Sequence, residues 1–234
     1  MSRRLLVGLV VGALTATAAD AARIQVAVAS NFAETMREIA RRFEDRTGHQ
    51  VVLAFASTGK HYAQISNGAP FEAFFAADEE RPRRLEQEGL AVPGSRFTYA
   101  IGKLVLWSPQ PGMVDAAGEV LEGGDFRHLA LANPRLAPYG RAARQVLESR
   151  GLWESLQARI VRGENIAQAF QFVASGNAEL GFVAGSQIER PGKPSTGSRW
   201  TIPEDLYLPI EQQAVLLEDE PVIRDFLRFV RDEE

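Results

Sequence analysis

The sequence predicts an α/β protein of two lobes, because strand and helix patterns alternate in two blocks bracketed by two long extended runs. The runs span residues 97–107 and 206–217 and are expected to cross between the lobes. The composition is that of a soluble globular protein, since 45% of the residues are apolar and 24% are charged. Periodicity alone leaves a single open sheet as the alternative.

The first block contains three short apolar runs, each followed by a helix pattern. Asn31 and Glu34 form a capping-box pattern before the first helix, which Gly48 closes. Ser57 opens the second helix, and Gly89 ends the third. Strand and helix alternating at this spacing predict parallel strands with right-handed crossovers. The predicted elements are strands at 24–29, 51–56 and 73–77, with helices over about 32–47, 57–67 and 79–88.

The second block repeats the alternation after residue 107. A loop rich in Pro, Gly and Ser follows at 190–198. The predicted elements are strands at 128–131, 159–161 and 180–184, with helices at 139–149, 166–174 and 220–231. The inward residues of the last helix are expected to be Val222, Phe226, Phe229 and Val230. The predicted lobes are residues 22–103 with 204–234, and residues 104–203.

Residues 1–21 have the three-part pattern of a cleavable signal peptide. Arg3 and Arg4 precede an apolar stretch at 5–14, and the segment ends with small residues up to Ala21. The stretch is too short to span a bilayer, which disfavours the alternative of a membrane anchor. Export without any Cys for a disulfide or a lipid anchor predicts the periplasm as the location.

Composition excludes several classes of function. Without Cys there is no thiolate metal site and no cysteine nucleophile. A net charge of −4 argues against binding to nucleic acid or to anionic lipid, and no later apolar run is long enough for membrane insertion. A serine nucleophile would need a histidine base, and none is suitably placed. His49 lies in a turn before a strand, His61 is expected to be solvated in the first turn of a helix, and His128 starts a strand at the end away from the crevice.

Four strand-to-helix junctions carry hydroxyl or amide side chains. They are Ser30-Asn31, Ser57-Thr58-Gly59, the segment from Asn133 to Gly140, and Glu164-Asn165-Ile166. Free backbone N–H groups and the positive end of the helix dipole attract an anion at such places. In parallel sheets these ends gather in one crevice. The alternative is that these residues are ordinary helix caps.

Several short motifs occur in an order that resembles the periplasmic molybdate-binding proteins of ABC transporters. The resemblance covers about residues 24–217. Its pieces include Val28-Ala29-Ser30-Asn31-Phe32, Ala56-Ser57-Thr58-Gly59, Phe75-Ala76-Ala77-Asp78-Glu79, Ala137-Pro138-Tyr139-Gly140 and Glu179-Leu180-Gly181-Phe182-Val183. It implies a two-lobed periplasmic-binding-protein fold of type II, each lobe a mainly parallel sheet flanked by helices, with the oxyanion between the lobes.

The resemblance also implies which residues bind the anion. They are Ser30, Asn31, Ser57, Thr58, Tyr139 and Ile166. Ile166 is implied through its backbone N–H, and Ser57 because it adjoins a matched position. The sequence departs from many relatives at Ala184, where they have Tyr, so Tyr139 is expected to supply the missing hydroxyl. The chain ends at Glu234, before the short Gly-aromatic ending expected of such proteins.

The implied function is capture of molybdate, or of the similar tungstate, and its delivery to an ABC permease. The resemblance implies no catalytic residue, no cofactor and no direct metal ligand, and a monomer is expected. The alternatives are a binding protein for another tetrahedral oxyanion such as sulfate, and an enzyme built on the same scaffold.

Overall fold

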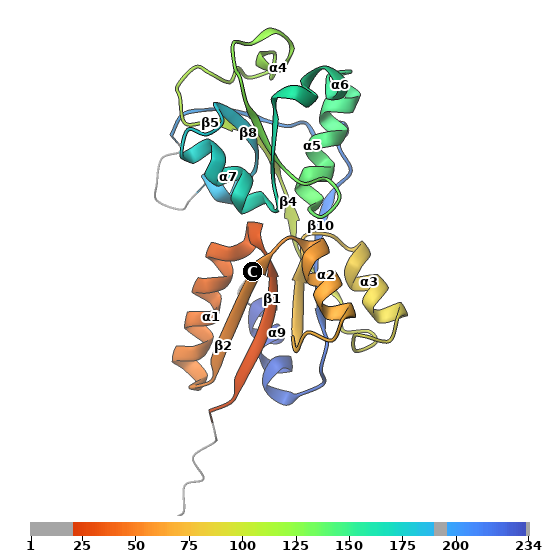
Figure 1. Ribbon diagram of the computed structural model, residues 1–234. Coiled ribbons are helices and arrows are strands. Elements are labelled where there is room, and N and C mark those ends of the chain that lie inside the picture. The colour runs from red at the N-terminus through yellow and green to blue at the C-terminus, as the bar shows by residue number, and fades with distance from the viewer. Residues whose placement is uncertain (1–20, 190–195, 233–234) are drawn as a thin grey trace, which may run out of the picture.

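The computed structural model describes residues 21–189 and 196–232, which form two sheets with helices packed on them (Figure 1). The first sheet has the strand order β2-β1-β3-β10-β4, and the second has the order β7-β6-β8-β5-β9. The strands of the first sheet are β1 (Arg23–Ala29), β2 (Gln50–Ala56), β3 (Ala73–Ala76), β4 (Phe97–Gly102) and β10 (Ile210–Leu216). Those of the second are β5 (Leu104–Ser108), β6 (Leu129–Ala132), β7 (Ile160–Gly163), β8 (Leu180–Ala184) and β9 (Ser198–Thr201).

Helices connect most of these strands. The first lobe contains η1 (Ser30–Phe32), α1 (Ala33–Thr47), α2 (Thr58–Ser66), α3 (Glu80–Gln87) and α9 (Pro221–Asp232). The second contains α4 (Val120–Gly123), α5 (Pro138–Ser149), α6 (Trp153–Leu156), η2 (Gln157–Arg159), α7 (Ile166–Ala174) and α8 (Gly185–Ile188), and η3 (Glu204–Leu206) lies on the returning chain. Among the described helices, none has the length and apolar character that a membrane span requires.

The predicted two-lobed α/β fold is confirmed, and the sheets within it are mixed. Strand β1 pairs in parallel with β2 and β3, whereas β10 is antiparallel to β3 and β4. The second sheet repeats this division, with β6 parallel to β7 and β8, and β5 antiparallel to β8 and β9. Parallel pairing is therefore limited to the strand–helix units, because the crossing strands arrive without a crossover helix of their own.

The two crossing runs are confirmed. Strand β4 ends in the first sheet at Gly102 and β5 begins in the second at Leu104, so Lys103 alone separates them. The chain returns through residues 202–209 and joins the first sheet as β10. Figure 1 shows β4 and β10 passing between the two lobes. These two connections are the covalent links about which the lobes can move relative to each other.

The structure corrects the predicted inward face of α9. Its buried side chains are Ile223, Phe226, Leu227 and Val230. Val222 and Phe229 are only partly buried. The buried set follows the i, i+3, i+4, i+7 spacing of one helix face. The prediction shares Phe226 and Val230 with this set and names Val222 and Phe229 in place of Ile223 and Leu227.

The predicted solvated position of His61 is also wrong. Its side chain is buried, and its ring nitrogens lie 3.1 Å from Gln64 Oε1 and 3.2 Å from the carbonyl oxygen of Val28. Helix α2 packs against β1, which places the ring under the helix and not on its solvent side. Burial lowers the pKa of His61, so the neutral ring is favoured.

The capping box predicted at Asn31 and Glu34 is not formed. Helix α1 begins at Ala33, after the short helix η1, and no side chain caps it. The Asn31 amide instead donates a hydrogen bond to Gln212. Gly48 ends α1 as predicted, with a left-handed φ of 75°.

Two other predictions fall partly outside the described residues. The signal peptide at 1–21 lies outside them except for its last residue. Of the loop predicted at 190–198, residues 190–195 also lie outside, and its last residue begins β9, which the sequence patterns did not indicate.

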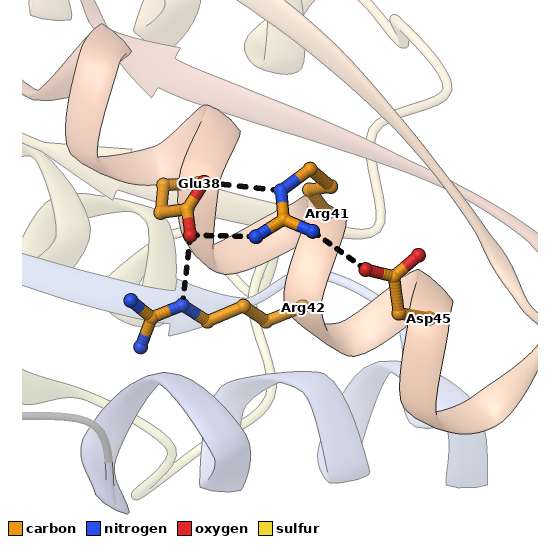
Figure 2. A network of polar contacts seen from close by, with 4 residues as sticks. All are labelled: Glu38, Arg41, Arg42 and Asp45. Carbon is orange, nitrogen blue, oxygen red and sulfur yellow. Dashed lines mark hydrogen bonds and ion pairs between the residues drawn. The ribbon is translucent and has the colours of Figure 1, made fainter.

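The solvent face of α1 carries a network of charged side chains (Figure 2). Glu38 Oε1 accepts hydrogen bonds from Arg41 at 2.8 Å and Arg42 at 2.9 Å, and Arg41 also contacts Asp45 at 2.7 Å. These hydrogen bonds, with Arg41 the stronger influence, lower the pKa of Glu38 to about 2. All four side chains are exposed, so the network lies apart from the cleft between the lobes.

Candidate functional site

The helix starts from both lobes surround one small cleft. Its lining residues are Ala29, Ser30, Asn31, Ala56, Ser57, Thr58, Ala77, Ala137, Pro138, Tyr139 and Ile166. All six residues that the sequence singled out are in this set, and all six are buried. The structure thus brings them together, and their role in binding an anion stays a prediction. They meet because parallel strands direct their carboxyl ends, and the helices that follow, to one edge of each sheet.

Three helices of at least two turns begin at the cleft. Thr58 is the first residue of α2, Pro138 the first of α5 and Ile166 the first of α7. The N–H groups of a first helical turn have no partner within the helix, and the helix dipole adds partial positive charge there. Pro138 suits its place because proline has no N–H to leave unpaired. The cleft therefore offers backbone donors from both lobes.

Hydroxyl groups add further donors. Ser57 Oγ is the one buried side-chain polar atom in the described part of the chain without a hydrogen-bond partner. Thr58 Oγ1 accepts a bond from the Ala77 N–H at 3.0 Å, which leaves the hydroxyl hydrogen of Thr58 free to donate. A buried unpaired hydroxyl costs stability unless a ligand satisfies it, so Ser57 indicates a polar ligand.

Tyr139 lies at the base of the cleft beside the crossing strands. A Cβ atom placed on Gly102, the last residue of β4, would come within 2.4 Å of the Tyr139 hydroxyl. Burial raises the pKa of Tyr139 above the ordinary value for a phenol, and nearby Tyr207 acts in the same direction. The hydroxyl therefore keeps its proton and can act as a donor.

The cleft is lined by neutral groups. No Asp, Glu, Lys or Arg is among the described residues that line it. Nearby cations pair with carboxylates across the lobes instead: Lys60 Nζ lies 3.6 Å from Glu164, and Arg141 lies 3.0 Å from Glu80 and 3.5 Å from Asp78. These ion pairs join α2 to the turn before α7, and α5 to the start of α3.

The Arg141→Gln variant is expected to weaken anion binding by less than about tenfold, because its ion pairs are partly exposed and such pairs contribute little. Calorimetric dissociation constants at low and high salt measure this. Arg144→Gln, on the same helix but paired with Glu148 within it, is the matched control and should have no effect. A loss of about a hundredfold for Arg141→Gln would show that the guanidinium contacts the anion directly.

The cleft is narrow in this arrangement of the lobes. Its cavity volume is ≈ 10 Å³, about the space of one water molecule. An oxyanion bound here would therefore be in close contact with lining groups from both lobes. A larger hollow of ≈ 350 Å³ lies alongside. Its charged lining residues are Asp78, Glu79, Glu80, Arg83, Arg141 and Glu211, and this excess of carboxylates disfavours an anion there.

Sequence reasoning missed two residues that contact Asn31. Gln212 Oε1 accepts a hydrogen bond from Asn31 Nδ2 at 2.5 Å, and Ser186 Oγ donates to the Asn31 carbonyl oxygen at 3.0 Å. The signal for Gln212 was present, because it lies between Ile210 and Ala214 at a buried position of the strand alternation. Ser186 had no comparable signal, since it lies on a short helix far along the chain from Asn31.

The chain resembles known proteins along most of its length. Residues 24–234 match the family of bacterial extracellular solute-binding proteins. The molybdate-binding protein ModA of Azotobacter vinelandii is 54% identical over 231 residues, which covers 97% of this chain and 91% of that protein. ModA of Rhodobacter capsulatus is 48% identical over 219 residues, covering 92% and 85%. The solved periplasmic molybdate-binding protein of Azotobacter vinelandii has a TM-score of 0.84 and 48% sequence identity, covering 88% of this chain and 90% of that chain.

Proposed function

We propose that this chain, which belongs to the family of bacterial extracellular solute-binding proteins, captures molybdate in the cleft between its lobes. The relatives that are 54% and 48% identical are named as molybdate-binding proteins. The observation that carries the proposal is the unpartnered, buried hydroxyl of Ser57 at a point where three helix N-termini converge. The proposed ligands are the six cleft residues Ser30, Asn31, Ser57, Thr58, Tyr139 and Ile166.

Neutral donors are sufficient to hold the anion. Molybdate is a dianion, and burying it without partners would cost tens of kcal/mol. A hydrogen bond to a charged group contributes roughly 1.5–3 kcal/mol, so about seven of them contribute on the order of 10–20 kcal/mol. The hydroxyls of Ser57 and Thr58, the phenol of Tyr139 and the first-turn N–H groups supply donors of this kind.

A lining of donors also accounts for selectivity. Hydrogen phosphate carries a proton that needs an acceptor, and such a lining has no good acceptor for it. Sulfate has shorter bonds than molybdate, so some donors in a site sized for molybdate are out of its reach. Tungstate is nearly identical in size to molybdate and is expected to bind equally. Sulfate binding remains the competing function, since the chemistry of the donors is the same.

Delivery follows from closure of the lobes. The proposed lobes, residues 22–103 with 204–234 and residues 104–203, would close on the anion about the two crossing connections. The closed form would then be the form that an ABC permease recognises. An exported monomer without a cofactor fits this role, and the Azotobacter vinelandii relative of known structure is named as periplasmic.

Molybdate is expected to stabilise the protein against thermal unfolding. A ligand that binds only the folded state adds about 2.7 kcal/mol at 100-fold excess over its dissociation constant. Melting curves and calorimetric titrations with molybdate, tungstate, sulfate and phosphate measure the effect. We expect molybdate and tungstate to raise the melting temperature, and phosphate to leave it unchanged. A melting temperature that does not change in millimolar molybdate contradicts the proposal. A melting temperature that rises with sulfate alone favours the competing function.

A further inference from the structure

Gln212 is a buried polar side chain on the otherwise apolar inward face of strand β10. Only 4% of its surface is exposed, and its neighbours on the same face of β10 are Ile210 and Ala214. Burying an amide is costly unless its polar atoms are paired. Gln212 Oε1 accepts one bond from Asn31 Nδ2 at 2.5 Å and another from the Tyr99 hydroxyl at 3.3 Å. Its acceptor atom is therefore directed at a residue that lines the cleft.

The surrounding structure holds Gln212 in this orientation. The register between β10 and β4 shifts between Gln212 and Gln213, and such an irregularity re-aims the side chains next to it. The Tyr99 hydroxyl also lies 3.1 Å from the carbonyl oxygen of Ala76, which anchors it to the neighbouring strand β3. Two strands therefore fix the place of the Gln212 carbonyl group.

Asn31 in turn contacts the second lobe. Its backbone carbonyl accepts the bond from Ser186 Oγ of α8, and both Asn31 and Tyr139 line the cleft. The Ser186 bond holds the Asn31 backbone, but the side-chain amide of Asn31 can still rotate about its own bonds, so its orientation needs a further constraint. Gln212 supplies that constraint from within the first lobe, although it lies 181 residues away in the chain.

We propose that Gln212 is a positioning residue of the anion site, which acts by fixing the amide of Asn31 toward the ligand and the second lobe. This inference rests on the proposed function. A neutral amide suits the position because it accepts a hydrogen bond without placing a negative charge near a bound dianion. A Glu of the same length would accept the same bond and repel the ligand.

The test compares Gln212→Met with Gln213→Met. Met has nearly the same length as Gln and removes the acceptor, and Gln213 is the matched control because its amide contacts Arg96 and Thr98 on the other face of the strand. We expect Gln212→Met to raise the dissociation constant for molybdate about tenfold and Gln213→Met to leave it within about twofold. If Gln212→Met does not fold, Gln212→Asn tests the same hydrogen bond. Asn keeps a buried amide, but its shorter side chain places the amide oxygen too far from Asn31 to accept the bond.

A double-variant cycle separates positioning from a general structural role. If Gln212 acts through Asn31, adding Gln212→Met to Asn31→Ala should change the dissociation constant by less than about twofold. If the two substitutions raise the dissociation constant by independent factors that multiply in the double variant, the inference is wrong. It is also wrong if the Gln212→Met protein binds molybdate as tightly as the parent. A parent protein that does not bind molybdate contradicts the proposed function itself, so the two failures are distinguishable.

Discussion

Removing the phenol oxygen in Tyr139→Phe is expected to weaken molybdate binding about 10- to 150-fold, because a hydrogen bond to a charged ligand contributes roughly 1.5–3 kcal/mol. The ring stays in place, so its packing at the start of α5 is kept. Calorimetric titration measures the loss in affinity, and a melting curve of the ligand-free protein should be nearly unchanged.

Tyr207→Phe is the matched control for this prediction. Tyr207 is buried close by, but its hydroxyl accepts a bond from the Leu104 N–H at 3.3 Å and does not line the cleft. Its loss should leave affinity within a few-fold. If Tyr139→Phe binds as tightly as the parent, Tyr139 is not a ligand, and the second lobe holds the anion through backbone N–H groups.

Adding a single methyl group in Gly59→Ala is expected to weaken binding about 5- to 150-fold by opposing closure, since overpacking costs about 1–3 kcal/mol. The Gly59 N–H donates to the Leu136 carbonyl oxygen across the cleft at 2.8 Å. A Cβ atom on Gly59 would lie 2.9 Å from that oxygen and 3.1 Å from the Leu136 Cα. Separation of the lobes relieves this contact, so the closed state alone is penalised.

Gly185 and Gly140 provide two control variants for the Gly59→Ala prediction. A Cβ atom on Gly185 would lie 3.5 Å from the Lys103 Cβ, an ordinary contact, so Gly185→Ala should leave both affinity and melting unchanged. A Cβ atom on Gly140 would lie 2.1 Å from the Ala132 carbonyl oxygen within one lobe, so Gly140→Ala should lower the melting temperature with or without ligand. A Gly59→Ala protein whose empty form melts early while its affinity is unchanged would contradict the closure argument.

Element positions were predictable where the local signals agreed. The helix at 166–174 and the strand at 180–184 match α7 and β8, since each has a clear period and a distinct start. Asn165 caps α7 by accepting a bond from the Gln168 N–H at 3.0 Å, so at this residue the alternative of an ordinary helix cap is the one that the structure shows. Strand β9 was missed because its short sequence follows a Gly- and Pro-rich stretch that predicts a loop.

Errors arose where one local signal had two possible outcomes. His61 is polar and lies in the first turn of a helix, which favours solvent, but α2 packs that turn onto β1. Asn31 has the residue type of a helix cap, yet its amide bonds to Gln212. In both cases a tertiary contact competes with a local preference of similar strength and decides the outcome.

The sequence by itself determined the chemistry of the cleft. Neutral hydroxyl and amide groups at strand ends follow from residue identity, and parallel strand–helix units direct those ends to one edge. Only the tertiary structure decided which groups meet across the lobes. Asn31 contacts Gln212 and Ser186 at separations of 181 and 155 residues, and local periodicity carries no information over such distances. These contacts depend on where two crossing strands place one lobe against the other, and that placement is set by packing of the whole chain.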